Sequence, residues 1–327
     1  MDRKKRTPII VIALFFLLFA VSLFALFRLA ERIINRMDEA SDALHYTDTG
    51  KSQLYYGGSL YTLDPNKESV LVMGIDSIET ADNSQADSLQ ADFIALLIID
   101  KLDHSFNVLH INRDTMTDIT QIDEDGNKYG TYLAQLALAH TYGGNGKLQC
   151  RNTVSAVENL LYNVKINHYI SFTMDAIPII NDSVGGVTIT LEHDLSDIGS
   201  EFTKGATVTL KGAKVLDFVR YRSAAATTSN LERMERQRQY ITAFADQYVG
   251  NDFDNMVETL ADISKYVVSD LTANQLSVLA ERLQTYSYGD TLTLSGEALK
   301  TDKYVEYYVD EAATQKTVID LFYKIEE

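Results

Sequence analysis

A long apolar run close to the N-terminus is the strongest pattern in the chain. Residues 8–27 contain no charged side chain, and roughly 20 helical residues at about 1.5 Å each cross a hydrocarbon core of about 30 Å. Arg3, Lys4, Lys5 and Arg6 precede the run, so the positive-inside rule predicts that this end lies in the cytoplasm. A cleaved signal peptide is the alternative, but the run is longer than a usual signal-peptide core and no clear cleavage site follows it. We therefore expect a cytoplasmic tail at 1–7, one transmembrane helix at 8–30 and an exported remainder.

Beyond the anchor, short apolar runs alternate with segments of helical spacing. Residues 31–68 are polar, turn at a Gly-Gly pair and are interpreted as a juxtamembrane stalk. Runs rich in Val, Ile and Leu predict strands, and apolar residues at intervals of three and four predict helices. The expected strands are 69–76, 92–100, 106–114, 168–175, 187–192, 206–212 and 291–296, and the expected helices are 132–142, 152–162, 231–248, 254–267, 273–286 and 310–325. Asn152 or Thr153 is the expected cap of the second helix, and Thr272 that of the fifth.

This alternation is typical of a layered α/β domain. We expect one domain at 69–248 with a C-terminal extension at 249–327 packed on it, because no Pro-rich or Ser-rich break separates them. Gly185 and Gly186, between an apolar segment and a strand, predict a tight turn. The apolar residues of 132–142 and 152–162 could line a lipid pocket, but core packing is the simpler explanation.

Composition and charge narrow the functional classes. Hydrophobic residues make up 46% of the chain, which is enough for a sizeable core. A net charge of −17 argues against general affinity for nucleic acid, so any anion site must be local. Cys150 is the only cysteine, which excludes an intrachain disulfide and fits a Gram-positive-type cell surface.

The local anion site is suggested by a cluster of arginines without lysine. Arg220 and Arg222 lie in the sequence VRYR, and if this is a strand they point to the same face and form a clamp. A guanidinium grips phosphate oxygens in a bidentate way, so this composition favours phosphate or carboxylate recognition. In the helix that follows, Arg233 and Gln237 share one side. Arg236 and Arg238 could face the same pocket or could pair with Glu232 and Glu235 on a solvated surface; both readings stay open.

Two acidic residues stand at the ends of predicted strands. Asp76 closes the first strand and Asp92 opens the second, so their carboxylates converge if these strands are antiparallel neighbours. Two hard oxygen ligands beside arginines are suited to holding Mg²⁺ against a diphosphate. Each aspartate alone would be read as a turn or cap residue. Arg113 and Asp114 follow the third strand, where loops of an α/β sheet often build a site. The six histidines show no metal-ligand spacing, and no nucleophilic triad is indicated.

Six segments, in this order after an N-terminal anchor, resemble the LytR-CpsA-Psr family. They are VLVMGIDS, ADFIALLIID, LHINRDT, NDSVGGVTIT, LKGAKVLDFVRYR and NLERMERQRQY, which cover roughly residues 69–248. The resemblance implies an extracytoplasmic three-layer α/β/α sandwich with a central mixed sheet. It also implies a polyprenyl (pyro)phosphate lipid in an apolar tunnel, with Mg²⁺ (or Mn²⁺) and arginines at its head group. The implied reaction is transfer of an undecaprenyl-pyrophosphate-linked glycopolymer, such as teichoic acid or capsule, onto peptidoglycan at the membrane.

The resemblance also assigns roles to individual residues. Asp76 and Asp92 stand at the family's metal-binding aspartates, and Arg113 stands in its Arg-Asp-Thr motif. The pyrophosphate-contacting positions are held by Arg220, Arg222, Arg233 and Gln237, and together with Arg113 and the two aspartates these are the expected site residues. The sequence does not identify the general base, for which Asp92 and Asp114 are the two candidates.

Several positions depart from the family pattern. Ile78 and Gln90 replace two arginines, Gln135 and Ala137 replace a lysine and an asparagine, and Asn230 replaces an acidic residue. The loss of charge leaves two hypotheses, a phosphotransferase or a non-catalytic polyprenyl-phosphate-binding or sensing protein of the envelope. A transcription attenuator is excluded, because an exported acidic domain with a short cytoplasmic tail cannot meet DNA.

Overall fold

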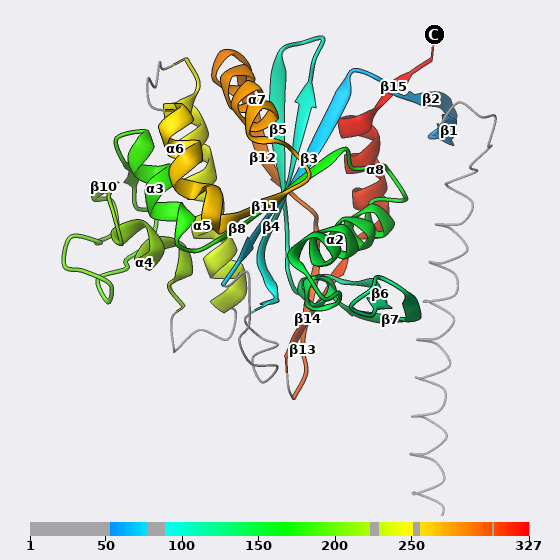
Figure 1. Ribbon diagram of the computed structural model, residues 1–327, viewed down its shortest axis with the longest axis horizontal. Coiled ribbons are helices and arrows are strands. Elements are labelled where there is room, and N and C mark those ends of the chain that lie inside the picture. Colours follow the sequence, from blue (N-terminus) through cyan, green and yellow to red (C-terminus); the bar gives the residue numbers. More distant parts are fainter. Residues whose placement is uncertain (1–52, 77–88, 223–228, 251–255, 303, 327) are drawn as a thin grey trace, which may run out of the picture. The chain divides into compact units, whose positions relative to one another are not determined.

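The computed structural model describes residues 53–76, 89–222, 229–250, 256–302 and 304–326 (Figure 1). The predicted tail, the predicted transmembrane helix and residues 31–52 of the predicted stalk lie outside these ranges. Among the described residues, no helix combines the length and the apolar character needed to cross a bilayer. The chain divides into one unit of Met1–Leu63 with Tyr323–Glu327 and a second unit of Asp64–Phe322.

The described part of the first unit is a small antiparallel sheet. Its strands are β1 (Gln53–Tyr56), β2 (Ser59–Leu63) and β15 (Tyr323–Ile325), in the order β1-β2-β15. Gly57 and Gly58 connect β1 to β2 with φ of 57° and 84°, a conformation that glycine adopts without strain. The stalk prediction placed the Gly-Gly turn correctly but did not foresee the strands on either side of it.

A mixed six-stranded sheet with the order β11-β8-β3-β4-β5-β12 is the centre of the second unit. The strands are β3 (Lys67–Ile75), β4 (Ala91–Asp100), β5 (Ser105–Ile111), β8 (His168–Thr173), β11 (Val267–Ser269) and β12 (Ser287–Thr293). β4 is antiparallel to both β3 and β5, whereas β8 is parallel to β3 and β12 is parallel to β5. β3 and β4 are buried over most of their length, which explains their nearly continuous apolar sequence. The mixed α/β fold with a central sheet is confirmed.

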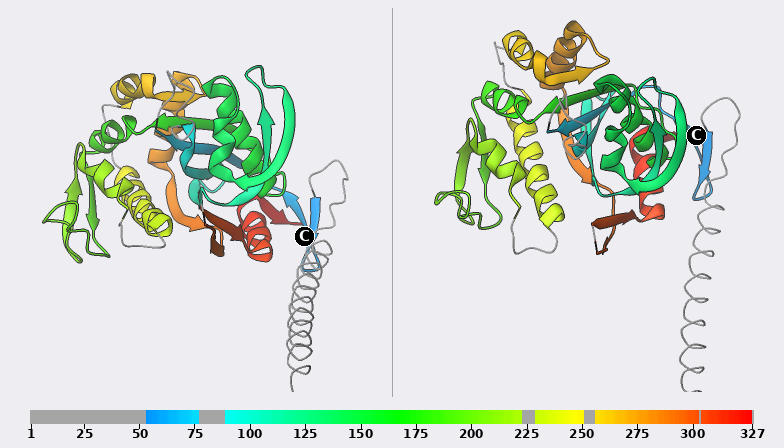
Figure 2. Two further views of the ribbon diagram at one scale, coloured as in Figure 1. Left: turned by 90° about the horizontal axis from the view of Figure 1, so that it is seen from below. Right: turned by 60° about the horizontal axis from the view of Figure 1, so that its bottom comes forward.

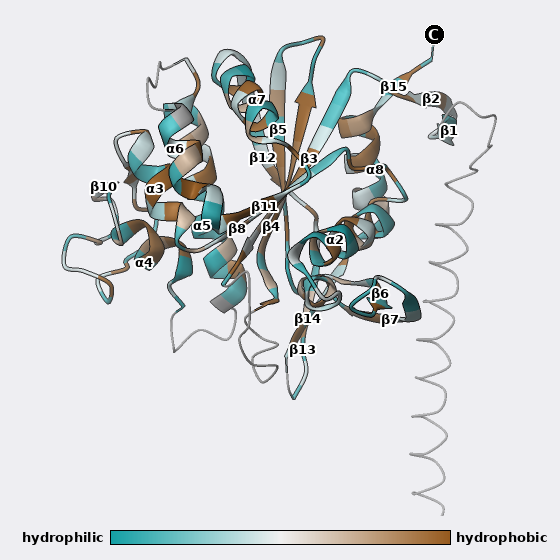
Figure 3. Ribbon diagram, viewed as in Figure 1, coloured by the Kyte–Doolittle hydropathy of each residue, from teal (hydrophilic) through white to brown (hydrophobic). Residues whose placement is uncertain are grey.

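Helices lie on both sides of this sheet (Figures 1 and 2). They are α2 (Gly146–Leu160), α3 (Ala176–Ser183), α4 (Lys214–Arg220), α5 (Ser229–Tyr248), α6 (Met256–Ile263), α7 (Ala273–Thr285) and α8 (Glu311–Phe322), with a 3-10 turn η3 at Ser264–Tyr266. Leu97 and Val108 on the sheet pack with Ala245 of α5 and Leu279 of α7. Figure 3 shows hydrophobic residues in strands of the central sheet and on parts of α3 and α8. Thr272 caps α7 through a reciprocal capping box with Gln275, as predicted.

Two sequence predictions about helices were wrong. Residues 132–142 form the end of β7 (Lys128–Gln135) and a 3-10 helix, η2 (Leu136–Thr141), because β7 pairs with β6 (Met116–Ile122). The helix expected from 152 begins at Gly146, where the Asn145 side chain accepts hydrogen bonds from the Lys147 and Leu148 amides. Asn152 is instead buried inside α2 and donates to the carbonyls of Thr120 and Ala139, at 2.9 and 2.7 Å. Neither Asn152 nor Thr153 is a cap.

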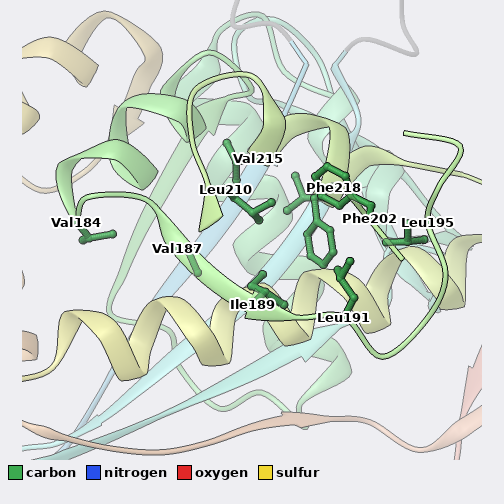
Figure 4. Packing of buried hydrophobic residues seen from close by; sticks show 10 residues of the cluster. Val184, Val187, Ile189, Leu191, Leu195, Phe202, Leu210, Val215 and Phe218 are labelled. Atoms are coloured by element: carbon green, nitrogen blue, oxygen red, sulfur yellow. The ribbon is translucent and has the colours of Figure 1, made fainter. Parts of the chain in front are cut away.

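A second apolar core positions the end of α4. The hairpin of β9 (Val187–Thr190) and β10 (Thr207–Leu210) packs with α4 around Phe202 and Phe218 (Figure 4). Tyr240 and Phe244 of α5 pack against the same core. Gly185 and Gly186 have φ of 80° and 86°, so the predicted tight turn is confirmed. This core holds the residues that follow Phe218 beside α5.

The C-terminal residues complete the second unit. β11 and β12 form the two edges of the central sheet although they follow residue 248. A separate hairpin, β13 (Gly296–Lys300) with β14 (Val305–Val309), is bridged to the loop after β5 through Thr115 and Tyr307. The C-terminal residues therefore contribute both to the sheet and to the surroundings of the β5 loop.

Candidate functional site

The ends of β3, β4 and β5 bring the predicted acidic and basic residues to one edge of the sheet. β3 and β4 are antiparallel, with Ile75 paired to Ala91, so Asp76 at the end of β3 lies beside the start of β4 that carries Asp92. Ile111 pairs with Ile94, which places Arg113 at the same edge. The convergence expected from antiparallel neighbouring strands is therefore present.

Asp92 is the centre of an arginine cluster. Arg113 makes a direct ion pair with the Asp92 carboxylate, and Nη2 of Arg233 and Nη2 of Arg222 lie 3.5 and 3.8 Å from Oδ1 of Asp92. Arg220 pairs separately, with its Nη2 3.4 Å from Oδ1 of Asp76. Three arginines thus share the one carboxylate of Asp92. A bound phosphate would supply further oxygen acceptors for their guanidinium N–H groups.

Arg220 and Arg222 reach the site from the end of a helix and not from the strand predicted for VRYR. Residues 214–220 are α4, and the chain becomes extended only at Tyr221, which has φ of −50° and ψ of 136°. The prediction of a strand was wrong because Phe218 is buried at helical spacing within the second core. Arg220 and Arg222 nevertheless line the same cavity.

Two side chains of α5 hold this segment in place. Nε of Arg236 donates to the Phe218 carbonyl at 3.3 Å and Nη2 donates to the Tyr221 carbonyl, while the guanidinium lies 5.3 Å from the centre of the Tyr221 ring. Nε2 of Gln237 donates to the Val219 carbonyl at 3.2 Å. Arg236 is therefore a buried positioning residue and not part of a solvated face, a role that spacing alone did not reveal.

Arg238 matches the alternative interpretation, in which it pairs with a glutamate of its own helix. Its guanidinium pairs with Glu235 of the same helix, and it does not line the cavity that contains the other arginines. The structure therefore separates the two residues that sequence reasoning had treated together.

Arg233 is the most buried cation of the cluster, with a side chain only 7% exposed. Burial, reinforced by the charges of Arg222 and Arg113, lowers the pKa of Arg233 to about 9. Its Nε has no hydrogen-bond partner among the described residues, although Nη2 donates to Oδ1 of Asn230 at 2.9 Å. A buried, incompletely satisfied guanidinium is expected where an anionic ligand completes the site.

Asp114 is held by two neutral amide side chains and by Arg113. Its Oδ1 accepts from Nε2 of Gln135 at 3.0 Å and from Nε of Arg113 at 3.3 Å, and its Oδ2 accepts from Nδ2 of Asn230. Nδ2 of Asn230 also donates to Oδ1 of Asn112 at 3.1 Å. Gln135 and Asn230, two of the positions that depart from the family pattern, thus serve to fix Asp114.

Of the other positions that depart from the family pattern, Gln90 and Ala137 lie among the described residues. Oε1 of Gln90 accepts a hydrogen bond from Nη2 of Arg113 at 3.0 Å. Gln90 therefore orients a neighbouring arginine, whereas the family pattern has an arginine at this position itself. Ala137 is buried in η2. Ile78 lies outside the described residues.

An apolar cavity of about 620 Å³ begins at this charged edge. Its charged end contains Asp76, Asp92, Arg220, Arg222 and Arg233, with Gln237 close by. Its walls are hydrophobic side chains of the sheet, α3 and α5, among them Leu97, Val108, Phe172, Ile180, Ile241 and Phe244. Residues 132–142 and 152–162 contribute nothing to it, so core packing was the correct reading for those stripes.

A second cavity of about 690 Å³ meets the first at Asp76, Asp92 and Arg222. Amide side chains, Arg113, Asp114 and the β13–β14 hairpin line the second cavity. Arg113 belongs to this cavity and not to the apolar one.

The donor set at the shared edge fits a hard divalent cation. The described residues contain no group of three or more His, Cys, Asp or Glu side chains arranged for a metal. Asp76 and Asp92 provide two carboxylates that line both cavities. Mg²⁺ and Mn²⁺ prefer such oxygen ligands, and Mg²⁺ takes few protein ligands beside phosphate and water.

A profile of the LytR_cpsA_psr family matches residues 34–321. The chain belongs to this family. A relative named polyisoprenyl-teichoic acid–peptidoglycan teichoic acid transferase TagU, from Enterococcus faecalis, is 28% identical over 218 residues, which cover 66% of this chain and 66% of the relative.

Solved structures of the same fold support the architecture. Bacillus subtilis TagV has a TM-score of 0.61 at 21% identity, over 79% of this chain and 98% of that one. A structure named "TagT bound to LI-WTA" has a TM-score of 0.59 at 20% identity, over 79% of this chain and 90% of that one. At this level of identity the likeness establishes the fold, which agrees with the mixed sheet described above.

Proposed function

We propose that this chain is a membrane-anchored phosphotransferase that attaches an undecaprenyl-pyrophosphate-linked glycopolymer, such as teichoic acid or capsule, to peptidoglycan. The observation that carries the proposal is an apolar cavity that ends at arginines and two carboxylates. A lipid diphosphate has the matching shape, with a long hydrocarbon tail and a compact anionic head. The relative's name, a teichoic acid transferase acting on peptidoglycan, agrees with this chemistry.

The charges of the site support a diphosphate together with a metal ion. Arg113, Arg220, Arg222 and Arg233 face Asp76, Asp92 and Asp114, which leaves one positive charge in excess. A diphosphate diester carries two negative charges, so the complex would be left with a net negative charge. Asp76 and Asp92 would hold Mg²⁺ (or Mn²⁺), and the bound ion would supply the positive charge that balances the diphosphate.

The chain's own residues then arrange a single displacement. A hydroxyl oxygen of a peptidoglycan sugar forms a bond to the phosphorus next to the glycan, and the bond from that phosphorus to the bridging oxygen breaks. The bridging oxygen keeps the bonding electrons and leaves as part of the lipid phosphate, while the hydroxyl proton passes to Asp92 or Asp114. Arg220, Arg222 and Arg233 stabilise the charge on the phosphoryl oxygens.

The proposed location follows from the N-terminal sequence. We infer a single-pass protein of the cell membrane with a cytoplasmic N-terminus and an extracytoplasmic main domain, the family domain at 69–248 carrying the extension at 249–327. Tethering to the leaflet that holds the lipid carrier raises the effective concentration of the two partners. A small arginine site therefore suffices against a net charge of −17.

The non-catalytic alternative, a polyprenyl-phosphate-binding or sensing protein, shares the lipid site but lacks the displacement. The test incubates the full-length chain in detergent with a polyprenyl diphosphate-linked amino sugar, Mg²⁺ and peptidoglycan. The expected products are polyprenyl monophosphate and an equal amount of sugar phosphate on peptidoglycan, and Asp92→Asn is expected to abolish both. Lipid binding without any cleavage would leave only the sensing function.

A further inference from the structure

The second cavity lies where the transfer reaction needs its acceptor. The apolar cavity and the second cavity meet at Asp76, Asp92 and Arg222. If the lipid tail fills the apolar cavity, the leaving lipid phosphate lies on that side of the reacting phosphorus. The attacking and leaving oxygens of a phosphoryl transfer are roughly in line, so the attacking hydroxyl must approach from the opposite side.

We propose that the second cavity binds a sugar residue of the acceptor peptidoglycan strand, with Tyr304 and Lys300 beside the β13–β14 turn as its specific contacts. The proposal rests on the proposed function, because it is that displacement which fixes the side of attack. It adds an acceptor-binding element from the C-terminal region, outside the segments on which the family resemblance rests.

The walls of the second cavity suit a neutral sugar ring. Gln90, Asn112, Gln135 and Asn230 present carboxamide groups. Gln135 and Asn230 already donate both of their amide N–H groups within the site, so their contribution is as acceptors, because each carboxamide oxygen has two lone pairs for sugar hydroxyl groups. Tyr304 is 49% exposed and lines the cavity. Aromatic rings pack against the C–H face of a sugar while amides bind its edge.

The hairpin is fixed to the loop that carries the catalytic charges. The Tyr307 amide donates to the Asp114 carbonyl at 2.9 Å, and Nε2 of Gln135 donates to the Val305 carbonyl at 2.7 Å. The buried Tyr307 hydroxyl donates to the Leu294 carbonyl at 2.9 Å. The acceptor contacts and Asp114 therefore keep a constant separation, which a positioned hydroxyl requires.

The backbone of Tyr304 holds the turn together. The Tyr304 carbonyl accepts from the Thr301 amide at 2.9 Å and from the Thr301 hydroxyl at 2.8 Å, and the Tyr304 amide donates back to that hydroxyl at 3.1 Å. These bonds are made by the backbone of Tyr304 and not by its ring. Tyr304→Ala should therefore remove the contact and keep the turn.

Tyr308 provides a matched control on the same hairpin. Tyr308 is 43% exposed and its hydroxyl donates to Glu306, but it does not line the cavity. A general effect of removing an exposed tyrosine, including weaker contact with a membrane surface, would appear in Tyr308→Ala as well.

The experiment measures two constants for full-length wild type, Tyr304→Ala and Tyr308→Ala in detergent. The first is the Kd of a soluble, uncrosslinked peptidoglycan glycan strand in the presence of polyprenyl monophosphate. The second is the Kd of a polyprenyl diphosphate, determined without a sugar and with an attached amino sugar. Tyr304→Ala should weaken strand binding roughly three- to tenfold and leave lipid binding within about twofold, while Tyr308→Ala should change neither.

Four other outcomes would overturn the acceptor site: unchanged strand binding in Tyr304→Ala, an equal loss in Tyr308→Ala, weakened binding of the sugar-free lipid, or a loss seen only with a lipid that carries its own sugar. The last would place the donor glycan in this cavity. Failure of the proposed function is distinguishable, because strand binding that depends on Tyr304 in a protein that transfers nothing would uphold the site and reject the reaction.

Discussion

Replacing Arg233 by methionine should make the ligand-free protein more stable. The Arg233 side chain is 7% exposed, and its pKa falls to about 9 because burial and then the charges of Arg222 and Arg113 oppose its protonated form. A shift of this size corresponds to a penalty on the order of 4–5 kcal/mol at neutral pH. Methionine keeps the packing of the stem but loses the 2.9 Å bond to Asn230 and the contact with Asp92, which together are worth about 2–3 kcal/mol. Arg233→Met is therefore expected to gain on the order of 1–3 kcal/mol.

The gain should depend on pH with a defined sign. Because the folded state lowers the pKa of Arg233, folding favours its neutral form, and the penalty is fully present below about pH 9. The penalty disappears as the pH rises from about 9 toward the ordinary arginine value. The stability difference between Arg233→Met and wild type should accordingly shrink above pH 9.

The same substitution should weaken ligand binding. Hydrogen bonds to charged groups contribute about 1.5–3 kcal/mol each, so the loss of one guanidinium contact lowers affinity for a polyprenyl diphosphate roughly 10- to 150-fold. Urea unfolding of the ligand-free protein and equilibrium lipid binding measure the two effects. Arg238→Met is the matched control, since Arg238 lies on the same helix but pairs with Glu235. If Arg233→Met were destabilised by more than about 1 kcal/mol and bound lipid normally, Arg233 would be a structural residue and not a ligand-binding one.

Three further predictions concern the cavity, the amide network and acid stability. Ile241→Trp fills part of the apolar cavity and should weaken binding of a long-chain polyprenyl diphosphate about tenfold or more, with little effect on a short-chain analogue. Asn230→Ala removes a donor to Asp114 and should lower kcat more than it raises the Kd of the lipid, as single-turnover kinetics would show. Burial, followed by the charges of Arg238 and Arg233, lowers the pKa of His110 to about 3. Folding therefore favours the neutral form of His110. Between about pH 6.5 and about pH 3, the free energy of unfolding should fall by up to about 1.4 kcal/mol for each pH unit of acidification. His110→Leu should flatten that part of a stability–pH curve; an unchanged slope would show that His110 does not contribute.

The central strands could be predicted from sequence because burial on both faces leaves a nearly continuous apolar run. β3, β4 and β5 lie where the runs at 69, 92 and 106 placed them. Residues 132–142 could not be assigned in the same way, because their spacing suits a helix while hydrogen bonding to β6 makes the first part a strand. The structure of that segment depends on pairing with another strand, and the local spacing of apolar residues carries no information about that partner.

Most charged residues of the site could be predicted from the sequence, but the residues that hold them in place could not. Asp76, Asp92 and the arginines are unusual residue types at strand and helix ends, so they stood out. Arg236 looked like its neighbour Arg238 in sequence, and only the fold shows that it holds the carbonyls of Phe218 and Tyr221. The β13–β14 hairpin reaches the site through the Tyr307 bridge, a contact between residues almost two hundred positions apart that no local signal announces.

The placement of the lipid tail is tested most directly by photolabelling the full-length protein with a polyprenyl diphosphate that carries a photoreactive group at the end of its tail. Labelled peptides should come from the walls of the apolar cavity, such as those containing Leu97, Val108 or Phe244, and an excess of unlabelled polyprenyl diphosphate should prevent the labelling. Labels confined to residues 132–162, with the cavity walls unmarked, would contradict this placement.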